Sequence, residues 1–575
     1  MFLIMKRDGT IVPFETDNII KAINKAFLEV DGQVYEYDTA RDIASDIEKD
    51  IAKIYEEHPL HREKKGFITV EDIQDMVEDY LMRSERRDVA RAYIRFRYKK
   101  EVARGIKDDF IKAVEEKLTA KNIKNQNANV DERSFGGRMG EAASYMTKDY
   151  ALKYLVSDMA PKNHLENRIY IHDLDHYAVG SHNCLSIPFD DLLANGFNTR
   201  QADIRPANSI NTAFQLVAVI FQLQSLQQFG GVSATHIDWT MVPYVRKSFY
   251  KHYMDGLKYF KFDGNAEEYN IFLQEEKSKT AQWYKKTFNK EYPSDDVASI
   301  SIVTGYSAAI EPRNCEKECL LAYKYAMEMT EKETMQAVEA MYHNLNTLQS
   351  RSGNQLPFTS INYGTCTLPE GRMVTKALIE GSIKGIGKLH KTSIFPCGIF
   401  QCMKGVNREP RDPNYDLFRL ALKSTAQRLY PNYANVDWSG NAGYDINDPR
   451  TYFSTMGCRT ANGWDINGLG QLKDGRGNIC PTTIILPTIA MEACEKWAAQ
   501  FNDKYKYVME LEEVFLEELD KAIHDAKDML IERFEWICSQ SPASARFMYE
   551  NGLMAGYIPE EGIRSALKHG TLALG

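Results

Sequence analysis

Residues 453 to 460 read Phe-Ser-Thr-Met-Gly-Cys-Arg-Thr and place a single cysteine among mostly polar neighbours. Gly457 permits a tight turn, so the sequence predicts that Cys458 lies at the exposed tip of a loop. Cys184 has a comparable setting in Gly-Ser-His-Asn-Cys-Leu-Ser, which begins at residue 180 and follows a predicted strand region. Both thiols are candidates for chemistry, although composition alone makes an inert thiol an equally good interpretation of either one.

The two cysteines belong to a region, residues 150–575, in which strand-like runs alternate with long helical patterns. The predicted strands cover residues 169–171, 299–303, 393–401 and 482–486, and the helical patterns include residues 209–229 and 315–348. Such alternation indicates one large α/β body, and a closed barrel would explain why no second boundary is visible. Residues 101–149 are polar and are expected to form a helical linker region.

Residues 1–100 have a pattern of their own. Strands over residues 2–6 and 11–14 flank a short turn, and Thr16 or Asp17 is expected to cap the helix that follows. The apolar residues expected on one face of that helix are Ile19, Ile20, Ile23, Ala26, Phe27 and Val30. The other predicted elements are helices over residues 39–56 and 69–82 and a basic stretch over residues 83–100.

The composition excludes several classes of protein. Of 575 residues, 43% are hydrophobic and 26% are charged, which is typical of a globular chain and unlike a disordered or fibrous one. The formal charge of −9 makes nucleic acid an unexpected partner, and no apolar run reaches the length of a membrane span. Ten cysteines without a signal peptide indicate reduced thiols in the cytoplasm. Cys315 and Cys319 lack a second pair, so no metal site is predicted.

The opening pattern Lys6-Arg7-Asp8-Gly9-x-x-x-Pro13-Phe14-Glu15 resembles the ATP-cone, a small allosteric nucleotide-binding domain at the N-terminus of many ribonucleotide reductases. A basic turn beside a helix N-terminus offers cationic side chains and backbone N–H groups to phosphates. The resemblance implies an α+β domain that binds ATP or dATP as effectors. The residues it implies for nucleotide contact are Lys6, Arg7, Glu15, Asn18 and Lys21, with Arg91 and Lys99 as further candidates.

The remaining motifs resemble the class III, oxygen-sensitive ribonucleoside-triphosphate reductases, and they occur in that family's order. They are His182-Asn183-Cys184, Gln228-Phe-Gly-Gly231, Gln355-x-Pro-Phe-Thr-Ser-x-Asn-x-Gly364, Met456-Gly-Cys458-Arg, Asp474-Gly-Arg-Gly-Asn478 and Leu486-Pro-x-Ile-Ala490. The resemblance implies a ten-stranded α/β barrel with a central finger loop that carries Cys458. It also implies that a thiyl radical on Cys458 abstracts the 3′-hydrogen of a bound ribonucleotide, and that Cys184 faces the other side of the sugar.

The same resemblance bears on the reductant and the substrate. Members that use formate carry a methionine two residues before the finger cysteine and an asparagine further on, and Met456 and Asn478 match these positions. Formate is therefore the favoured reductant, while Cys480 keeps a redox-protein donor as an alternative. The candidate residues for binding the ribonucleoside triphosphate are His182, Asn183, Ser352, Gly353, Gln355 and Thr359; a plain loop before a strand is the alternative for the last four.

One departure from the family concerns its glycyl radical. Family members store the radical on a glycine in a C-terminal segment preceded by a four-cysteine zinc site, and neither pattern is in this sequence. We therefore expect the sequence to be truncated or to omit a tail, with the structural zinc confined to that region. The implied partners are an iron-sulfur activase that uses S-adenosylmethionine and a second copy of the chain, as a dimer or, with dATP, a tetramer.

Two other functions remain open at this point. The first is a catalytically silent nucleotide sensor that controls a partner by oligomerising, and the retained pair Cys184 and Cys458 argues against it. The second is another glycyl-radical lyase, which would place two adjacent cysteines on the finger, whereas Cys458 stands alone.

Overall fold

The protein is described by a computed structural model that covers residues 2–6, 10–32, 38–57, 68–119, 134–288, 317–350, 355–438, 444–457, 460–462, 474–501 and 509–575. The chain forms two compact units, Met1–Glu116 and Lys117–Gly575. The division falls within a long helix, α4 (Arg87–Thr119), which continues without a break past the predicted boundary at residue 100. The predicted linker over residues 101–149 thus begins inside α4 and also contains α5 (Phe135–Tyr150).

The first unit pairs a small hairpin with helices. Its elements are β1 (Leu3–Met5), β2 (Ile11–Pro13), α1 (Thr16–Asp31), α2 (Asp38–Glu57), α3 (Val70–Arg83) and α4. The two strands are antiparallel, and Ile19, Ile23, Ala26 and Phe27 of α1 are buried as predicted. Val30 is exposed instead, because it lies in the last turn of α1. The predicted cap was also wrong: α1 starts after Glu15, which makes no side-chain capping bond.

The second unit is built around parallel strands. Its main sheet has the order β10-β9-β8-β7-β4, and every neighbouring pair is parallel. These strands are β4 (Leu185–Ser186), β7 (Val232–Ala234), β8 (Thr359–Tyr363), β9 (Cys397–Cys402) and β10 (Asn432–Asn435). The helices between successive strands include α8 (Ile210–Ser225), α10 (Val242–Lys261), α13 (Lys317–Thr347), α14 (Pro369–Lys384) and α15 (Tyr415–Arg428). Strand–helix alternation with parallel pairing makes this unit an α/β body.

A second sheet has the order β14-β13-β3 and joins the first through the backbone. Its strands are β3 (Ile169–Ile171), β13 (Asn478–Ile484) and β14 (Thr571–Leu574). The Cys184 N–H donates to the carbonyl of Asn478 at 2.9 Å, and the Ser186 N–H donates to that of Arg476 at 2.8 Å. The five-stranded and three-stranded sheets are therefore hydrogen-bonded side by side, which is consistent with the predicted ten-stranded barrel without closing it among the described residues.

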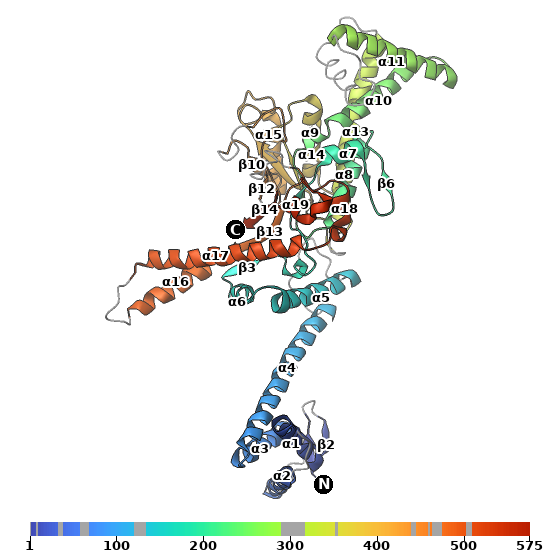
Figure 1. Ribbon diagram of the computed structural model, residues 1–575. Helices are drawn as coiled ribbons and strands as arrows, with labels where there is room; N and C mark the ends of the chain where they lie inside the picture. The colour runs from blue at the N-terminus through green and yellow to red at the C-terminus, as the bar shows by residue number, and fades with distance from the viewer. Residues whose placement is uncertain are drawn as a thin grey trace. The chain divides into compact units, whose positions relative to one another are not determined.

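Other helices and short strands complete the body. In Figure 1, α10 and α13 run side by side away from the sheet toward α11, and α16 and α17 form a hairpin. The remaining helices are α6 (Met159–Leu165), α7 (Phe189–Asn195), α9 (Ile237–Thr240), α11 (Ala266–Phe288), α16 (Leu486–Gln500), α17 (Leu511–Cys538), α18 (Arg546–Glu550) and α19 (Ile563–Leu567), with the short turns η1 (Ala151–Leu155), η2 (Leu174–His176), η4 (Pro542–Ala545) and η5 (Pro559–Glu561). The short strands are β5 (Phe197–Asn198), β6 (Asp203–Ile204), β11 (Ser454–Thr455) and β12 (Ala461–Asn462).

The predicted elements of the body mostly occur where the pattern placed them. The strand over residues 169–171 is β3, and the helix from residue 209 is α8, which Ser209 caps by accepting from the Thr212 N–H. The helical pattern over residues 315–348 contains α13. The strand predicted from residue 393 starts only at Cys397, because Pro396 has no N–H to give to a ladder. Residues 299–303 lie outside the described residues.

Among the helices that the structure describes, none combines the length and the apolar composition needed to cross a bilayer.

A buried carboxylate fixes the turn that follows β8. Asp238 is fully buried, and its Oδ2 accepts the N–H groups of Gly364 at 2.9 Å and of Cys366 at 3.0 Å. Burial raises the pKa of Asp238, and these two N–H groups oppose the shift. The substitution Asp238→Ala leaves both N–H groups without an acceptor, so we expect the free energy of unfolding to fall by about 3 kcal/mol. The midpoint of urea unfolding measures this, with Asp263→Ala at an exposed position as control; equal midpoints would contradict the assignment.

Candidate functional site

The segment around Cys458 is a hairpin. β11 pairs antiparallel with β12, with Ser454 opposite Asn462, and the Met456 N–H donates to the Thr460 carbonyl at 3.0 Å. The connection between the two strands contains Cys458, which with Arg459 lies outside the described residues. We call residues 453–462 the finger hairpin.

Two buried amides on the main sheet hold the finger hairpin. Asn362 of β8 donates from Nδ2 to the carbonyls of Thr455 at 2.9 Å and Ala234 at 3.0 Å, and Gln401 of β9 donates from Nε2 to the carbonyl of Phe453 at 3.2 Å. Both amide side chains are fully buried. Backbone carbonyls in a protein interior require donors, so these amides fix how deeply the hairpin sits against the sheet.

The tip of the hairpin approaches the sheet more closely than a side chain would allow. A Cβ on Gly457 would lie 2.8 Å from Cε1 of Phe358, and a Cβ on Gly231 would lie 2.8 Å from Cδ1 of the same ring. Glycine at these two positions therefore lets the ring pack between the hairpin and the segment before β7.

A cavity of about 720 Å³ brings the distant motifs together. Cys184 and Asn478, which are separated by most of the body in sequence, both line it with Thr460 of the finger hairpin. The other lining residues are His172, Asp173, Asn183, Gly230, Gly231, Phe358, Pro481, Thr482, Thr483, Thr571, Leu572, Ala573, Leu574 and Gly575. The cavity therefore has a thiol on the β4 side and the hairpin that carries the second cysteine on another side.

The Cys184 side chain is buried and hydrogen-bonded on both sides of its sulfur. Its Sγ donates to Oδ1 of Asn183 at 2.9 Å and accepts the Gly231 N–H at 3.3 Å. Cys184 is also one of the residues that line the cavity. Such a thiol is positioned to react with a molecule in the cavity and is shielded from solvent elsewhere.

Asn478, which lines the cavity, has a buried amide oxygen. Its Nδ2 lies 3.4 Å from Oγ1 of Thr460, while Oδ1 is buried and has no hydrogen-bond partner among the described residues. A buried amide oxygen without a donor is destabilising unless a bound molecule supplies one. A hydroxyl group in the cavity would satisfy it.

Apart from Asn183, none of the predicted substrate residues that the structure describes lines this cavity. His182 lines a separate cavity of about 520 Å³, and its Nε2 lies 3.1 Å from the Tyr549 hydroxyl. Burial lowers the pKa of His182 to about 4, with a smaller contribution from Arg533, so this imidazole is neutral at pH 7. Thr359 is fully buried within β8, and Gln355 does not line the Cys184 cavity. Ser352 and Gly353 lie outside the described residues.

Met456 is buried, with 1% of its surface exposed, and its side chain is not among those that line the cavity. His172 and Asp173, by contrast, line the cavity and were not predicted. The signal was present in Ile-His-Asp-Leu-Asp, where polar residues directly follow the strand over residues 169–171.

A second group of polar residues lies at the carboxyl ends of β4 and β7, where no metal was predicted. Ligand atoms of Asp190, His236 and Asp474 all lie within 4.8 Å of one another. His236 Nε2 is 3.0 Å from Asp190, and the Thr235 hydroxyl donates to Asp474 at 2.5 Å. Burial alone would raise the pKa of Asp190, but His236 outweighs it and lowers the pKa to about 2. These groups satisfy one another as an ion-paired network.

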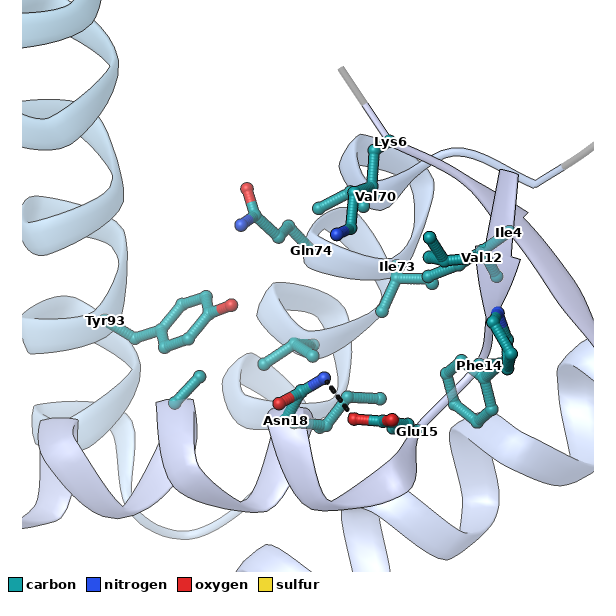
Figure 2. A pocket seen from close by; sticks show the side chains of 14 residues that line it. Ile4, Lys6, Val12, Phe14, Glu15, Asn18, Val70, Ile73, Gln74 and Tyr93 are labelled. Carbon is teal, nitrogen blue, oxygen red and sulfur yellow. Dashed lines mark hydrogen bonds between the residues drawn. The ribbon is translucent and has the colours of Figure 1, made fainter. Parts of the chain in front are cut away.

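The first unit contains its own pocket of about 430 Å³ between the hairpin and helices α1, α3 and α4. Figure 2 shows Lys6 near one side of it, Glu15 and Asn18 joined by a hydrogen bond of 3.1 Å near another, and the Tyr93 hydroxyl pointing inward. Three predicted contacts thus line one pocket, together with Gln74 and Tyr93, which were not predicted. Lys21 and Arg91 are exposed outside it. Arg7 and the side chain of Lys99 lie outside the described residues.

Two family models match this chain. Residues 126–575 match the family model of the anaerobic ribonucleoside-triphosphate reductases. The chain belongs to this family. Residues 2–102 match the model of the ATP cone domain. The first match covers all residues that line the Cys184 cavity, and the second covers all residues that line the pocket of the first unit.

Individual relatives in the family extend beyond this chain. The chain is 27% identical to the anaerobic ribonucleoside-triphosphate reductase of Haemophilus influenzae over 100% of its own length and 69% of the relative's. It is 29% identical to that of Escherichia coli over 85% of its length and 58% of the relative's. A crystal structure of the anaerobic ribonucleotide reductase from Thermotoga maritima aligns at 13% identity with a TM-score of 0.47, covering 83% of this chain and 66% of that one.

The hydrogen bonds of Asn362 predict how the finger hairpin loses order. The substitution Asn362→Leu keeps the number and branching of the side-chain heavy atoms but removes the donors to Thr455 and Ala234. We expect backbone amides in residues 452–457 to exchange with deuterium about tenfold faster or more, as measured by mass spectrometry, because each lost donor destabilises the hairpin by about 1–3 kcal/mol. Asn447→Ala, at a nearby exposed residue, should leave exchange unchanged. Equal exchange in both variants would show that the amide does not hold the hairpin.

Proposed function

We propose that this chain carries the nucleotide-binding and thiol chemistry of an anaerobic ribonucleoside-triphosphate reductase, which converts ribonucleoside triphosphates to 2′-deoxyribonucleoside triphosphates in the cytoplasm. The observation that supports it is the single cavity shared by Cys184, Asn478 and the finger hairpin. A sugar bound there would have a thiol on one side and the Cys458-bearing hairpin on another.

The proposed chemistry is the one that the resemblance to the family implies. A thiyl radical on Cys458 takes the 3′-hydrogen of the ribose, the 2′-hydroxyl leaves as water with an added proton, and Cys184 takes part in the reduction of the sugar before the 3′-hydrogen returns. Holding reactants in one enclosed cavity is what makes such hydrogen transfers fast. A glycyl radical, installed by an activase that uses S-adenosylmethionine, would supply the oxidising equivalent to Cys458.

The orphaned oxygen of Asn478 supports a hydroxyl-bearing substrate. Ribose hydroxyls are donors, and Oδ1 of Asn478 has no other donor among the described residues. The described lining residues include no Lys or Arg, so the triphosphate is expected to extend out of this cavity.

Formate is the reductant that the site fits better. Asn478 Nδ2 and the Thr460 hydroxyl are neighbouring donors for a small carboxylate at the cavity wall. One formate and one proton balance the reaction, since formate loses two electrons as carbon dioxide while the 2′-hydroxyl leaves as water. The alternative of thiol relay through Cys480 fits less well, because that thiol is fully buried, donates to the Leu530 carbonyl and has a pKa that burial raises to about 12.

The pocket of the first unit is the proposed effector site for ATP and dATP. It combines an apolar wall from Ile4, Val12 and Ile73 with the Lys6 ammonium and the Asn18 amide, which suits a base with attached phosphates. Regulation then requires that effector binding shift the equilibrium between states of the body that differ in activity.

The thiol pair is tested by Cys458→Ser and Cys184→Ser in protein that forms deoxynucleotides when activated. Serine cannot carry the hydrogen transfers, so each variant is expected to abolish product formation, measured by chromatography of labelled nucleotides, while nucleotide binding is retained. The control is Cys494→Ser, because Cys494 is exposed on α16 away from the cavity. Turnover by either cysteine variant at the parental rate would refute the proposed mechanism.

The effector pocket is tested by Lys6→Glu. Replacing a cation with an anion in the pocket repels phosphates, so dATP affinity measured by equilibrium dialysis should fall about tenfold or more, and inhibition by dATP should weaken in parallel. Lys49→Glu makes the same charge change on α2, outside the pocket, and should leave affinity intact. Equal losses in the two variants would mean that only overall charge matters.

A further inference from the structure

Asp173 lies on the wall of the Cys184 cavity and has no role in the mechanism above. Its backbone is in the left-handed region, with a φ of 54°, although it is not a glycine. Residues held in this region are stabilised by their surroundings, and they often occur at functional sites. By itself, this conformation indicates that the surrounding residues hold the backbone of Asp173 in place.

The side chain of Asp173 is the start of a chain of hydrogen bonds. Its Oδ2 accepts a hydrogen bond from Nδ2 of Asn183, and Oδ1 of Asn183 accepts the hydrogen of the Cys184 thiol at 2.9 Å. A carboxylate can only accept, whereas an amide has a donor end and an acceptor end. Asp173 therefore determines which end of the Asn183 amide faces Cys184, and the end it selects is the oxygen.

We propose that Asp173 is a positioning residue that acts through Asn183 to keep Cys184 a protonated thiol with its hydrogen directed at the Asn183 oxygen. The inference rests on the proposed function for the task it gives Cys184. A thiol that delivers a hydrogen atom must retain that hydrogen, whereas the thiolate is the form that attacks electrophiles and disulfides. A hydrogen bond donated by the neutral thiol favours the protonated form.

The ionisable groups around the thiol agree with this assignment. Among the described lining residues they are His172, Asp173 and Cys184. Burial lowers the pKa of His172; the Asp173 carboxylate opposes that shift and Arg533 adds to it. A neutral His172 provides no positive charge for a thiolate, and the nearby Asp173 carboxylate disfavours one. The Gly231 N–H, at 3.3 Å from the sulfur, acts in the opposite direction.

The test is Asp173→Asn in the full chain. The new amide both donates and accepts, so Asn183 is free to turn its NH₂ toward the sulfur and stabilise the thiolate. We expect Cys184 to react with iodoacetamide about tenfold faster at neutral pH, a change equivalent to one pKa unit of the thiol, as measured by mass spectrometry of the Cys184 peptide. Asp175→Asn is the matched control, because Asp175 belongs to the same turn but its carboxylate accepts from the Ser144 hydroxyl.

A second variant separates positioning from a general loss of structure. Asn183→Ala removes the acceptor and should raise the Cys184 alkylation rate by itself, and adding Asp173→Asn to it should raise the rate no further, because Asp173 acts through Asn183. Cys366, which is fully buried, should remain unreactive in every variant and so reports unfolding.

Three results would overturn the proposal: a parental Cys184 rate in Asp173→Asn, an equal rise in Asp175→Asn, or additive effects in the double variant. Alkylation requires no turnover and no radical, so these outcomes are independent of whether the protein forms deoxynucleotides.

Discussion

The amide hydrogen bonds from Asn362 and Gln401 to the finger hairpin are the interaction on which the rest of this structure depends. A parallel sheet normally packs apolar side chains on both faces, yet here buried amides and the Ser233 and Ser360 hydroxyls occupy one face. The backbone of the finger hairpin supplies acceptors to the two amides, the carbonyl of Thr455 to Asn362 and the carbonyl of Phe453 to Gln401. The described part of the hairpin in turn brings Thr460 to the cavity that Cys184 lines.

Local patterns predicted the elements that local forces determine. The strand over residues 169–171 and the helix capped by Ser209 follow from alternation, apolar periodicity and a capping hydroxyl, and these were confirmed. The family motifs pointed to Cys184 and Asn478, and the structure brings both to one cavity. The ends of elements were less predictable, as the late start of β9 shows. Pro396 has no N–H for the ladder, and Oδ1 of Asn346 accepts the N–H groups of residues 394 and 395.

What could not be predicted depends on contacts between residues far apart in sequence. Nothing near Asn362 in the sequence indicates that its amide would meet Thr455, and nothing near His182 indicates that it would face Tyr549 and a different cavity from its neighbour Cys184. His182 lines the cavity beside Tyr549, whereas the next two residues of the same motif, Asn183 and Cys184, line the other cavity. Asp173 was missed because its importance arises only through Asn183.

The two units have separate hydrophobic cores, one built from residues of the cone and one from residues of the body. The pocket of the first unit and the Cys184 cavity therefore belong to units that each contain their own buried apolar residues, and α4 extends across the division. The described lining residues of the Cys184 cavity include no Lys or Arg, whereas the pocket of the first unit contains Lys6.

The central claim is that the Cys458 thiol reaches the cavity wall opposite Cys184. The most direct measurement is cross-linking of the full chain with dibromobimane, a short reagent that joins two nearby thiols, followed by peptide mass spectrometry. The account predicts a Cys184–Cys458 cross-link that forms in the free protein and is suppressed by a bound ribonucleoside triphosphate. Reaction of the two cysteines as separate, unlinked thiols, with or without nucleotide, would contradict it.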